Sequence, residues 1–193
     1  MIVATLLVAA ALLVAASLRR PAPTAYEPTP VAPKEEGRRL AGPAVITIDA
    51  THDREWRFFD FSRGSRVETE GALDWDLAFR RNRIIANGGP GFAGQGGIRD
   101  LGAVPFDSLG RAPAVGYRPT DAGRDTVNPA IADWYDYGFT SHLLTPKAHL
   151  YAVRTADGHF AKLEVLGYYC SGARAGCLTF RYVYQGDRSR VLR

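Results

Sequence analysis

The first 18 residues constrain this chain most, because they contain no charged side chain and only two polar ones, Thr5 and Ser17. A helix of this length would measure about 27 Å, close to the hydrocarbon thickness of a bilayer. The sequence therefore predicts a signal-anchor or transmembrane helix at residues 1–18. A cleaved secretory signal is the alternative, because Ala15 and Ala16 provide small residues for cleavage, although no positive charge precedes the apolar run.

A proline-rich segment follows, in which five of the thirteen residues from Pro21 to Pro33 are proline. Proline restricts the backbone to extended conformations and excludes a helix. We expect residues 19–43 to form a tether and residues 44–193 to fold as one domain. The tether could hold this domain away from a membrane or lie along a partner's surface.

The charge of the chain argues against nucleic acid as a partner. Lys and Arg number 24 against 20 Asp and Glu, and Arg19 and Arg20 account for two of the positive charges. The rest of the chain is therefore almost neutral, whereas nucleic-acid-binding domains carry clustered basic residues. Apolar residues make up 46% of the chain, which is enough to build a hydrophobic core.

The pattern of apolar and polar residues after the proline-rich segment is that of strands. Trp75, Leu77 and Phe79 alternate with more polar neighbours, which predicts a strand with one face in the core. An Asp157-Gly158 pair predicts a hairpin turn. The other expected strands are rich in aromatic or β-branched residues and lie at 45–48, 56–61, 83–86, 150–155, 160–169 and 178–184.

One short helix is expected at Pro129–Tyr137, with Asn128 as its N-cap and Pro129 at its first position. The glycine-rich stretch from Gly88 to Asp125 is expected to be loop-rich. The fold class is therefore all-β, β-rich with one or two short helices, preceded by an N-terminal hydrophobic helix.

Cys170 and Cys177 are the only cysteines, and they flank a short polar stretch between two β-prone runs. A hairpin would bring them within disulfide distance. Two unpaired thiols are the alternative, whereas a metal site lacks further ligands nearby. Because a disulfide needs an oxidising compartment, we expect the β domain on the periplasmic or extracytoplasmic side. Arg19 and Arg20 taken alone would favour a cytoplasmic location for that end of the helix.

The sequence does not predict an enzyme. Residues 89–94 fit G-x-G-x-x-G, but the glycines that follow do not begin the helix that a dinucleotide site needs. Asp74 and Asp76 flank Trp75 and could act as an acid–base pair. The nearby arginines favour ion pairs with these carboxylates instead, namely Arg80, Arg81 and Arg83.

His142 and His149 are candidate ligands of a haem iron. They lie seven residues apart in a loop-like stretch, and two imidazoles across a cleft can ligate haem iron axially. Aromatic residues close by could cover a porphyrin, namely Trp134, Tyr135, Tyr137 and Phe139. The alternative is that all four histidines, which include His52 and His159, are surface residues without a ligand role.

Two longer stretches carry a family resemblance. The first runs from Trp75–Arg81 to Ile84 and Asn87–Gly89. The second runs from Tyr151–Gly158 through Ala161–Leu163 and Tyr168–Tyr169 to Thr179–Gln185. In order and spacing they resemble the HmuY family of bacterial haem-binding proteins, over residues 45–185. The resemblance implies an all-β, hand-shaped domain, exported beyond the inner membrane, that grips haem between two loops with two axial histidines.

Two functions follow as hypotheses. The first is a non-enzymatic, extracytoplasmic haem- or porphyrin-binding protein anchored in the bacterial cell membrane by its N-terminal helix, with His142 and His149 as candidate iron ligands. No cysteine for lipid attachment follows the apolar segment, whereas many family members are lipoproteins or secreted. The second is a single-helix accessory subunit that packs into and caps an integral-membrane complex, respiratory or photosynthetic, without binding haem. An Ala- and Val-rich helix suits close packing between helices.

Overall fold

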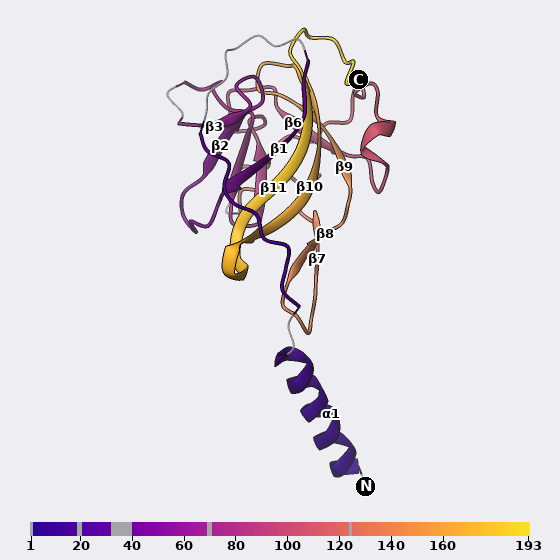
Figure 1. The fold of residues 1–193 in the computed structure, drawn as a ribbon. Helices are drawn as coiled ribbons and strands as arrows, with labels where there is room; N and C mark the ends of the chain where they lie inside the picture. Colours follow the sequence, from indigo (N-terminus) through magenta and orange to yellow (C-terminus); the bar gives the residue numbers. More distant parts are fainter. Residues whose placement is uncertain (1, 19–20, 32–39, 69–70, 124) are drawn as a thin grey trace.

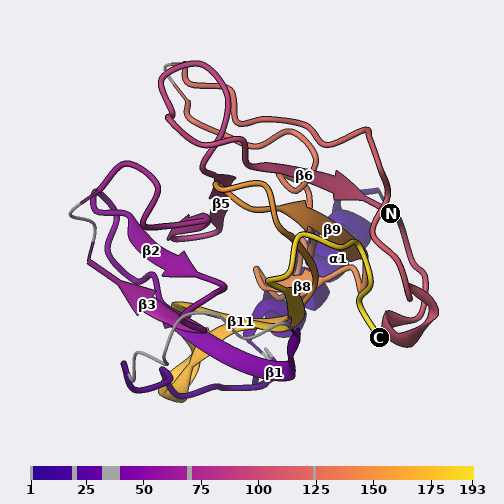
Figure 2. The ribbon, with the colours of Figure 1, turned by 90° about the horizontal axis from the view of Figure 1, so that it is seen from above.

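Two antiparallel sheets pack face to face in the computed structural model, which describes residues 2–18, 21–31, 40–68, 71–123 and 125–193 (Figures 1 and 2). The larger sheet has five strands, in the spatial order β1 (Leu40–Asp49), β11 (Arg174–Gln185), β10 (Phe160–Cys170), β9 (Leu150–Arg154) and β6 (Gly97–Asp100). The smaller sheet has the order β3 (Ser65–Val67), β2 (Arg57–Asp60), β4 (Leu77–Arg80) and β5 (Arg83–Ala86).

A separate hairpin, one 17-residue α-helix and two short 3-10 turns complete the fold of the described residues. The hairpin pairs β7 (Tyr135–Tyr137) with β8 (Leu144–Pro146). The helices are α1 (Ile2–Leu18) and the single 3-10 turns η1 (Phe106–Ser108) and η2 (Ser171–Ala173). Figure 1 shows α1 projecting from the end of the domain where the hairpin lies.

The main core fills the space between the two sheets with aromatic side chains. The Phe59 ring of β2 meets Phe180 of β11 edge-on, with ring centres 5.2 Å apart, and Phe79 of β4 stacks on Phe180 at 5.4 Å. Phe59, Phe79 and Phe180 are fully buried. Aromatic pairs of this kind add to the free energy gained by burying apolar area, so they hold the two sheets together.

The all-β fold class is confirmed, and so are most of the expected strands. β5 occupies the expected residues, and β9, β10 and β11 extend or end within a few residues of the predicted bounds. The Asp157-Gly158 pair lies in the turn that joins antiparallel strands β9 and β10. The stretch from Gly88 to Asp125 is loop-rich, and among its described residues only β6 and η1 are regular elements.

The helix predicted at Pro129–Tyr137 is wrong. Asn128 does cap a turn, because its Oδ1 accepts a hydrogen bond from the backbone N–H of Ala130 at 3.1 Å. The turn ends at Trp134, whose indole is buried and donates from Nε1 to the carbonyl of Asn82 at 2.8 Å. From Tyr135 the backbone pairs with β8, and this pairing replaces a second helical turn.

The apolar N-terminal segment is helical, as predicted, and none of the side chains of α1 is buried. Among the residues that the structure describes, no helix has both the length and the apolar character needed to cross a membrane. The transmembrane span expected at residues 1–18 is therefore not supported.

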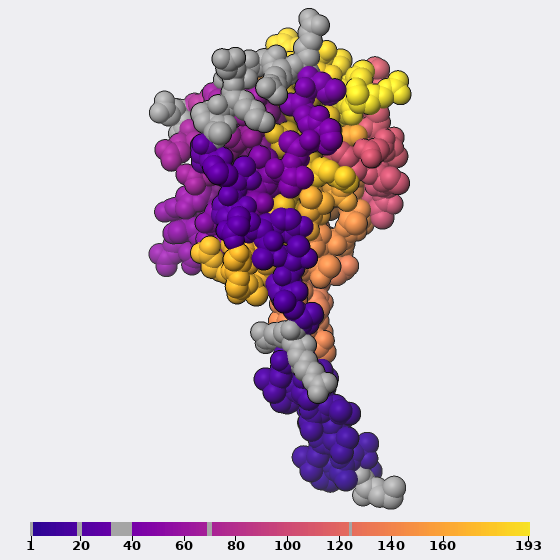
Figure 3. Space-filling view, in the orientation of Figure 1, coloured from indigo at the N-terminus to yellow at the C-terminus, as the bar shows by residue number. Residues whose placement is uncertain are grey.

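Part of the predicted tether lies on the domain (Figure 3). The backbone N–H of Tyr26 donates to the carbonyl of Tyr169 at 2.8 Å, and the N–H of Thr29 donates to the carbonyl of Thr47 at 2.9 Å. Residues 21–31 thus run along the larger sheet. Of the predicted tether, 19–20 and 32–39 lie outside the described residues, and 40–43 already belong to β1.

Candidate functional site

His142 lies at the tip of the β7–β8 hairpin. It is exposed, its φ of 55° is in the left-handed region, and its N–H donates to the carbonyl of Gly138 at 2.7 Å, which closes the tip. The imidazole Nδ1 shares a hydrogen bond with the hydroxyl of Tyr137. The hairpin therefore holds the His142 ring in a defined orientation.

A cleft of about 360 Å³ lies between this tip and the C-terminal half of α1. Phe139, Thr140 and His142 form one wall, and apolar residues that include Leu13 and Val14 form the other. Phe139 is 78% exposed. The volume lies in the range typical of small-molecule sites, about 300–1,000 Å³. The structure thus places one candidate imidazole beside an apolar cleft.

His149 lies just before β9, next to the end of β6. Its Nδ1 is 2.9 Å from Oδ2 and 3.1 Å from Oδ1 of Asp100. A carboxylate on one ring nitrogen fixes the orientation of an imidazole and favours a free lone pair on the other nitrogen, as is usual for metal-binding histidines. No sequence pattern predicts Asp100 as the partner of His149, because the two residues are 49 positions apart.

The structure does not bring His142 and His149 together. They flank β8, whose three residues span roughly 10 Å, and they contact different elements, β7 and β6. Each has Nδ1 engaged, and within the described part of the chain Nε2 of each accepts no hydrogen bond. Each therefore keeps a nitrogen with which it could ligate iron.

Two of the four aromatic residues predicted to cover a porphyrin are engaged elsewhere in the fold. Trp134 is buried in the core, and the Tyr135 hydroxyl accepts a hydrogen bond from Asn82 at 2.9 Å. Tyr137 and Phe139 remain exposed at the hairpin tip.

The other two histidines, His52 and His159, form hydrogen bonds within their own turns. His52 Nδ1 accepts hydrogen bonds from the backbone N–H groups of Arg54 and Glu55, at 3.2 and 3.0 Å. His159 Nδ1 lies 2.6 Å from Asp157 in the turn between β9 and β10. Over residues 2–18, 21–31, 40–68, 71–123 and 125–193, no three His, Cys, Asp or Glu side chains group into a metal site.

Asp74 and Asp76 do not pair with the nearby arginines, so that prediction is wrong. Asp74 precedes the strand and its Oδ2 accepts the N–H of Gly71 at 2.6 Å. Asp76 is 4% exposed, and burial together with the charge of Asp60 raises its pKa to about 8. Its two oxygens accept backbone N–H groups of Phe61 and Ala156. Asp76 is therefore a structural residue that joins loops of the two sheets.

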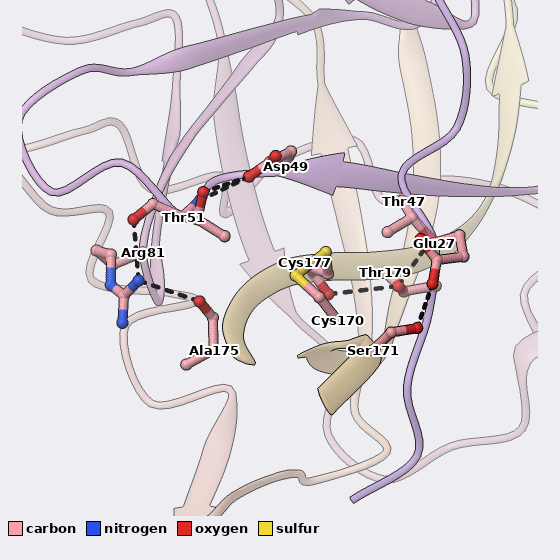
Figure 4. Close-up of a disulfide and its surroundings, with 10 residues drawn as sticks. All are labelled: Glu27, Thr47, Asp49, Thr51, Arg81, Cys170, Ser171, Ala175, Cys177 and Thr179. Atoms are coloured by element: carbon pink, nitrogen blue, oxygen red, sulfur yellow. Dashed lines mark hydrogen bonds between the residues drawn. A yellow bond between two sulfur atoms is a disulfide. The ribbon is translucent and has the colours of Figure 1, made fainter. Parts of the chain in front are cut away.

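The disulfide between Cys170 and Cys177 is confirmed (Figure 4). The two Cα atoms are 5.0 Å apart. Cys170 is the last residue of β10, opposite Arg174, and Cys177 lies three residues further along β11. Both cysteines are buried, and the described residues include no free cysteine.

Residues 89–94 form turns rather than a dinucleotide site, as expected. Gly89 has φ of 109°, and a Cβ there would lie 2.4 Å from the carbonyl oxygen of Thr120, so this position requires glycine. No helix follows, and the next regular element is β6.

Fold and site together define a disulfide-bonded β-sandwich that carries an imidazole on an exposed hairpin. The chain belongs to the HmuY family, because the model of the family described as HmuY protein matches residues 52–182. No curated protein sequence matches the chain significantly.

Solved structures share the fold. An apo HmuY analog from Tannerella forsythia is 16% identical, with a TM-score of 0.61, and the match covers 79% of this chain and 99% of that one. A proposed HmuY-like haem-binding protein from Bacteroides vulgatus is 21% identical, with a TM-score of 0.56 and coverages of 79% and 95%. A proposed lipoprotein from Bacteroides fragilis is 16% identical, with a TM-score of 0.58 and coverages of 79% and 92%.

One polar cluster is not predicted by the sequence. Arg54, Arg80, Arg81 and Arg83 line a single cleft. Three arginines among the four residues 80–83 are visible in the sequence, where they favour ion pairs with Asp74 and Asp76. In the structure these arginines line one cleft together and form no ion pair with Asp74 or Asp76.

Proposed function

We propose that this chain is a non-enzymatic, extracytoplasmic protein that binds haem or a related porphyrin at the β7–β8 hairpin, with His142 as the first iron ligand. The observation that carries the proposal is the His142 imidazole, which is oriented through Nδ1 by Tyr137, has Nε2 free, and lines an apolar cleft. Membership of the HmuY family supports the choice of haem.

His149 is the candidate for the second axial ligand. Its Asp100 partner leaves Nε2 available, which suits an iron ligand. Because His149 lies at the other end of β8, both histidines can reach one iron only if the hairpin tip bends toward β6. Without this bend, only His142 would ligate the iron, and the two complexes differ in the coordination number of the iron.

The disulfide supports an oxidising compartment, since such bonds persist outside the cytoplasm. The exposed apolar side chains of α1 and the lipoprotein description of one structural neighbour support association with a membrane. None of the described contacts and none of the comparisons favours the accessory-subunit alternative.

Titration of the full chain with haemin tests the proposal. We expect haemin to give a shifted Soret band with the wild type, and the position of this band should change in His142→Ala. If both histidines ligate the iron, His149→Ala should change the wild-type spectrum from six-coordinate to five-coordinate. His52→Ala is the control, because His52 is held by its own turn. A spectrum that is identical in wild type and in the His142→Ala, His149→Ala double variant would refute the assignment of the ligands, and the absence of any Soret shift would refute haem binding.

A further inference from the structure

A cleft of about 430 Å³ between the loop after β1 and the β4–β5 turn is strongly basic. Its lining includes four arginines against one carboxylate, that of Asp53, so its formal charge is +3 (four minus one). The Asp53 side chain is 79% exposed. The arginines are Arg54, Arg80, Arg81 and Arg83.

Neutral groups hold two of these arginines in place. Arg81 Nη1 donates to the carbonyls of Thr51, at 2.9 Å, and Ala175, at 3.0 Å (Figure 4). The guanidinium of Arg80 lies 4.4 Å from the ring centre of Trp56. Because carbonyls and an aromatic face position the guanidinium groups without neutralising them, their positive charge remains available to an anion.

The other two arginines are also open to an anion. Arg83 contacts Asp125 at 3.3 Å in an exposed ion pair, which contributes little to stability and exchanges easily. Arg54 forms no ion pair with any residue in the described ranges. Guanidinium groups bind phosphate oxygens through pairs of parallel hydrogen bonds, so a phosphate group fits this cleft chemically.

The cleft lies at the end of the domain that faces α1. Arg81 reaches Ala175 beside the β10–β11 turn, and Asn82 donates to Tyr135 of β7. Figure 1 shows that turn and the β7–β8 hairpin at the end from which α1 projects. Residues 21–24 line a groove with β8, so the chain enters the domain at this same end.

Apolar and aromatic groups accompany the arginines at this end. Tyr137 and Phe139 at the hairpin tip are 55% and 78% exposed, and α1 exposes large apolar side chains along its whole length. Asp136 on the hairpin lies 3.9 Å from Lys147, which offsets its negative charge. Basic residues next to exposed aromatic rings and an apolar helix are typical of surfaces that contact lipid bilayers.

We propose that the arginine cleft binds the phosphate groups of anionic lipids, so that this end of the β domain docks on a membrane surface beside α1. Free phosphate would meet the same guanidinium groups, but only a lipid surface would also contact the exposed rings of the hairpin tip and the apolar side chains of α1 at the same end of the domain. The inference does not depend on haem binding.

Vesicle binding by the full chain tests this inference. The variant R54A/R80A/R83A removes three charges and keeps Arg81, which holds the loops together. R99A/R111A/R188A removes the same charge from other parts of the domain and is the matched control. Vesicles of phosphatidylcholine alone are compared with vesicles of equal parts phosphatidylcholine and phosphatidylglycerol. Because α1 can partition into both, only the difference in affinity between the two kinds of vesicle measures binding by the arginine cleft.

We expect the affinity gained from phosphatidylglycerol to fall roughly 100-fold in R54A/R80A/R83A, at about fivefold for each basic residue, and to be largely kept in the control. Hydrogen exchange should show protection of residues 51–54 and 80–83 by the anionic vesicles only. Equal losses in both variants, or no loss in either, would overturn the proposal. Equal protection by inorganic phosphate would identify a free-anion site and would also overturn docking to lipid.

Discussion

The Asp76 carboxyl group accepts a hydrogen bond at 2.8 Å from the backbone N–H of Ala156, 80 residues further along the chain. Its second oxygen accepts the N–H of Phe61 at 2.9 Å. Phe61 follows β2 of the smaller sheet, and Ala156 follows β9 of the larger one. One buried side chain therefore ties the two sheets together.

Asp76 should make stability depend on pH. Its pKa is raised to about 8, so the folded state keeps a proton that the unfolded chain, with a carboxyl pKa of about 3.9, releases. Through this group, the free energy of unfolding should decrease as pH rises from about 4 to about 8, by at most about 1.4 kcal/mol per pH unit. Denaturant titrations near both ends of this pH range measure the slope.

The variant Asp76→Asn isolates this contribution. Asparagine cannot ionise, so the slope from this position should disappear. Its NH₂ group would also face one of the two backbone donors, which should cost about 1–3 kcal/mol at every pH. Asp74→Asn is the control and should keep the wild-type slope. If Asp76→Asn kept that slope as well, Asp76 would not be its source.

The disulfide should contribute to stability through the unfolded chain. It closes a loop with a sequence separation of 7, for which the chain-entropy relation gives about 2.5 kcal/mol. We expect the Cys170→Ala, Cys177→Ala variant to unfold at lower denaturant concentration by this amount. Reductant should destabilise the wild type and leave the variant unchanged. An equal response of both proteins to reductant would contradict this prediction.

Local signals were sufficient to predict the long strands β9, β10 and β11 and the disulfide, but not the short strands β3, β6, β7 and β8. Leu77 and Phe79 lie in the core between the sheets, as their alternation in the sequence predicts. Trp75, expected on the same face, is instead buried with Ala78 in a second cluster, so both faces of β4 are covered. Cys170 and Cys177 are close in sequence and flank a short turn, so their pairing also needs only local information.

The hydrogen-bond partners of His149 and Asp76 and the structure of residues 129–137 depend on contacts between residues that are distant in sequence. The His149 partner Asp100 and the Asp76 partner Ala156 lie far away in sequence, and no local pattern identifies them. In the Pro129–Tyr137 segment, contacts with distant residues override a local signal. Its cap residue Asn128 behaves as predicted, but burial of Trp134 and pairing with β8 decide the rest.

The Arg81 side chain should stabilise the domain, although the backbone conformation at this position favours glycine. Its φ of 54° is in the left-handed region, and its guanidinium joins Thr51 to Ala175. Arg81→Ala should destabilise the domain by roughly 2–3 kcal/mol, since it removes charge-assisted hydrogen bonds and keeps the unfavourable φ. Arg81→Gly should be about 1 kcal/mol more stable than Arg81→Ala. Chemical denaturation of both variants tests the order, and the reverse order would contradict the role of φ.

Docking of residues 21–31 should depend on one contact between an aromatic ring and a glycine. The Tyr26 ring lies over Gly167 of β10, where any Cβ would clash with it, while the Tyr26 N–H binds Tyr169. Tyr26→Ala and Gly167→Ala should therefore both release this segment, one by removing the ring and the other by displacing it. We expect faster hydrogen exchange and easier proteolysis confined to residues 21–31. The melting temperature should change little, because the core between the sheets is untouched. Tyr137→Ala, which removes an exposed ring elsewhere, is the control, and a loss of protection spread over β10 and β11 would show that the segment is part of the core instead.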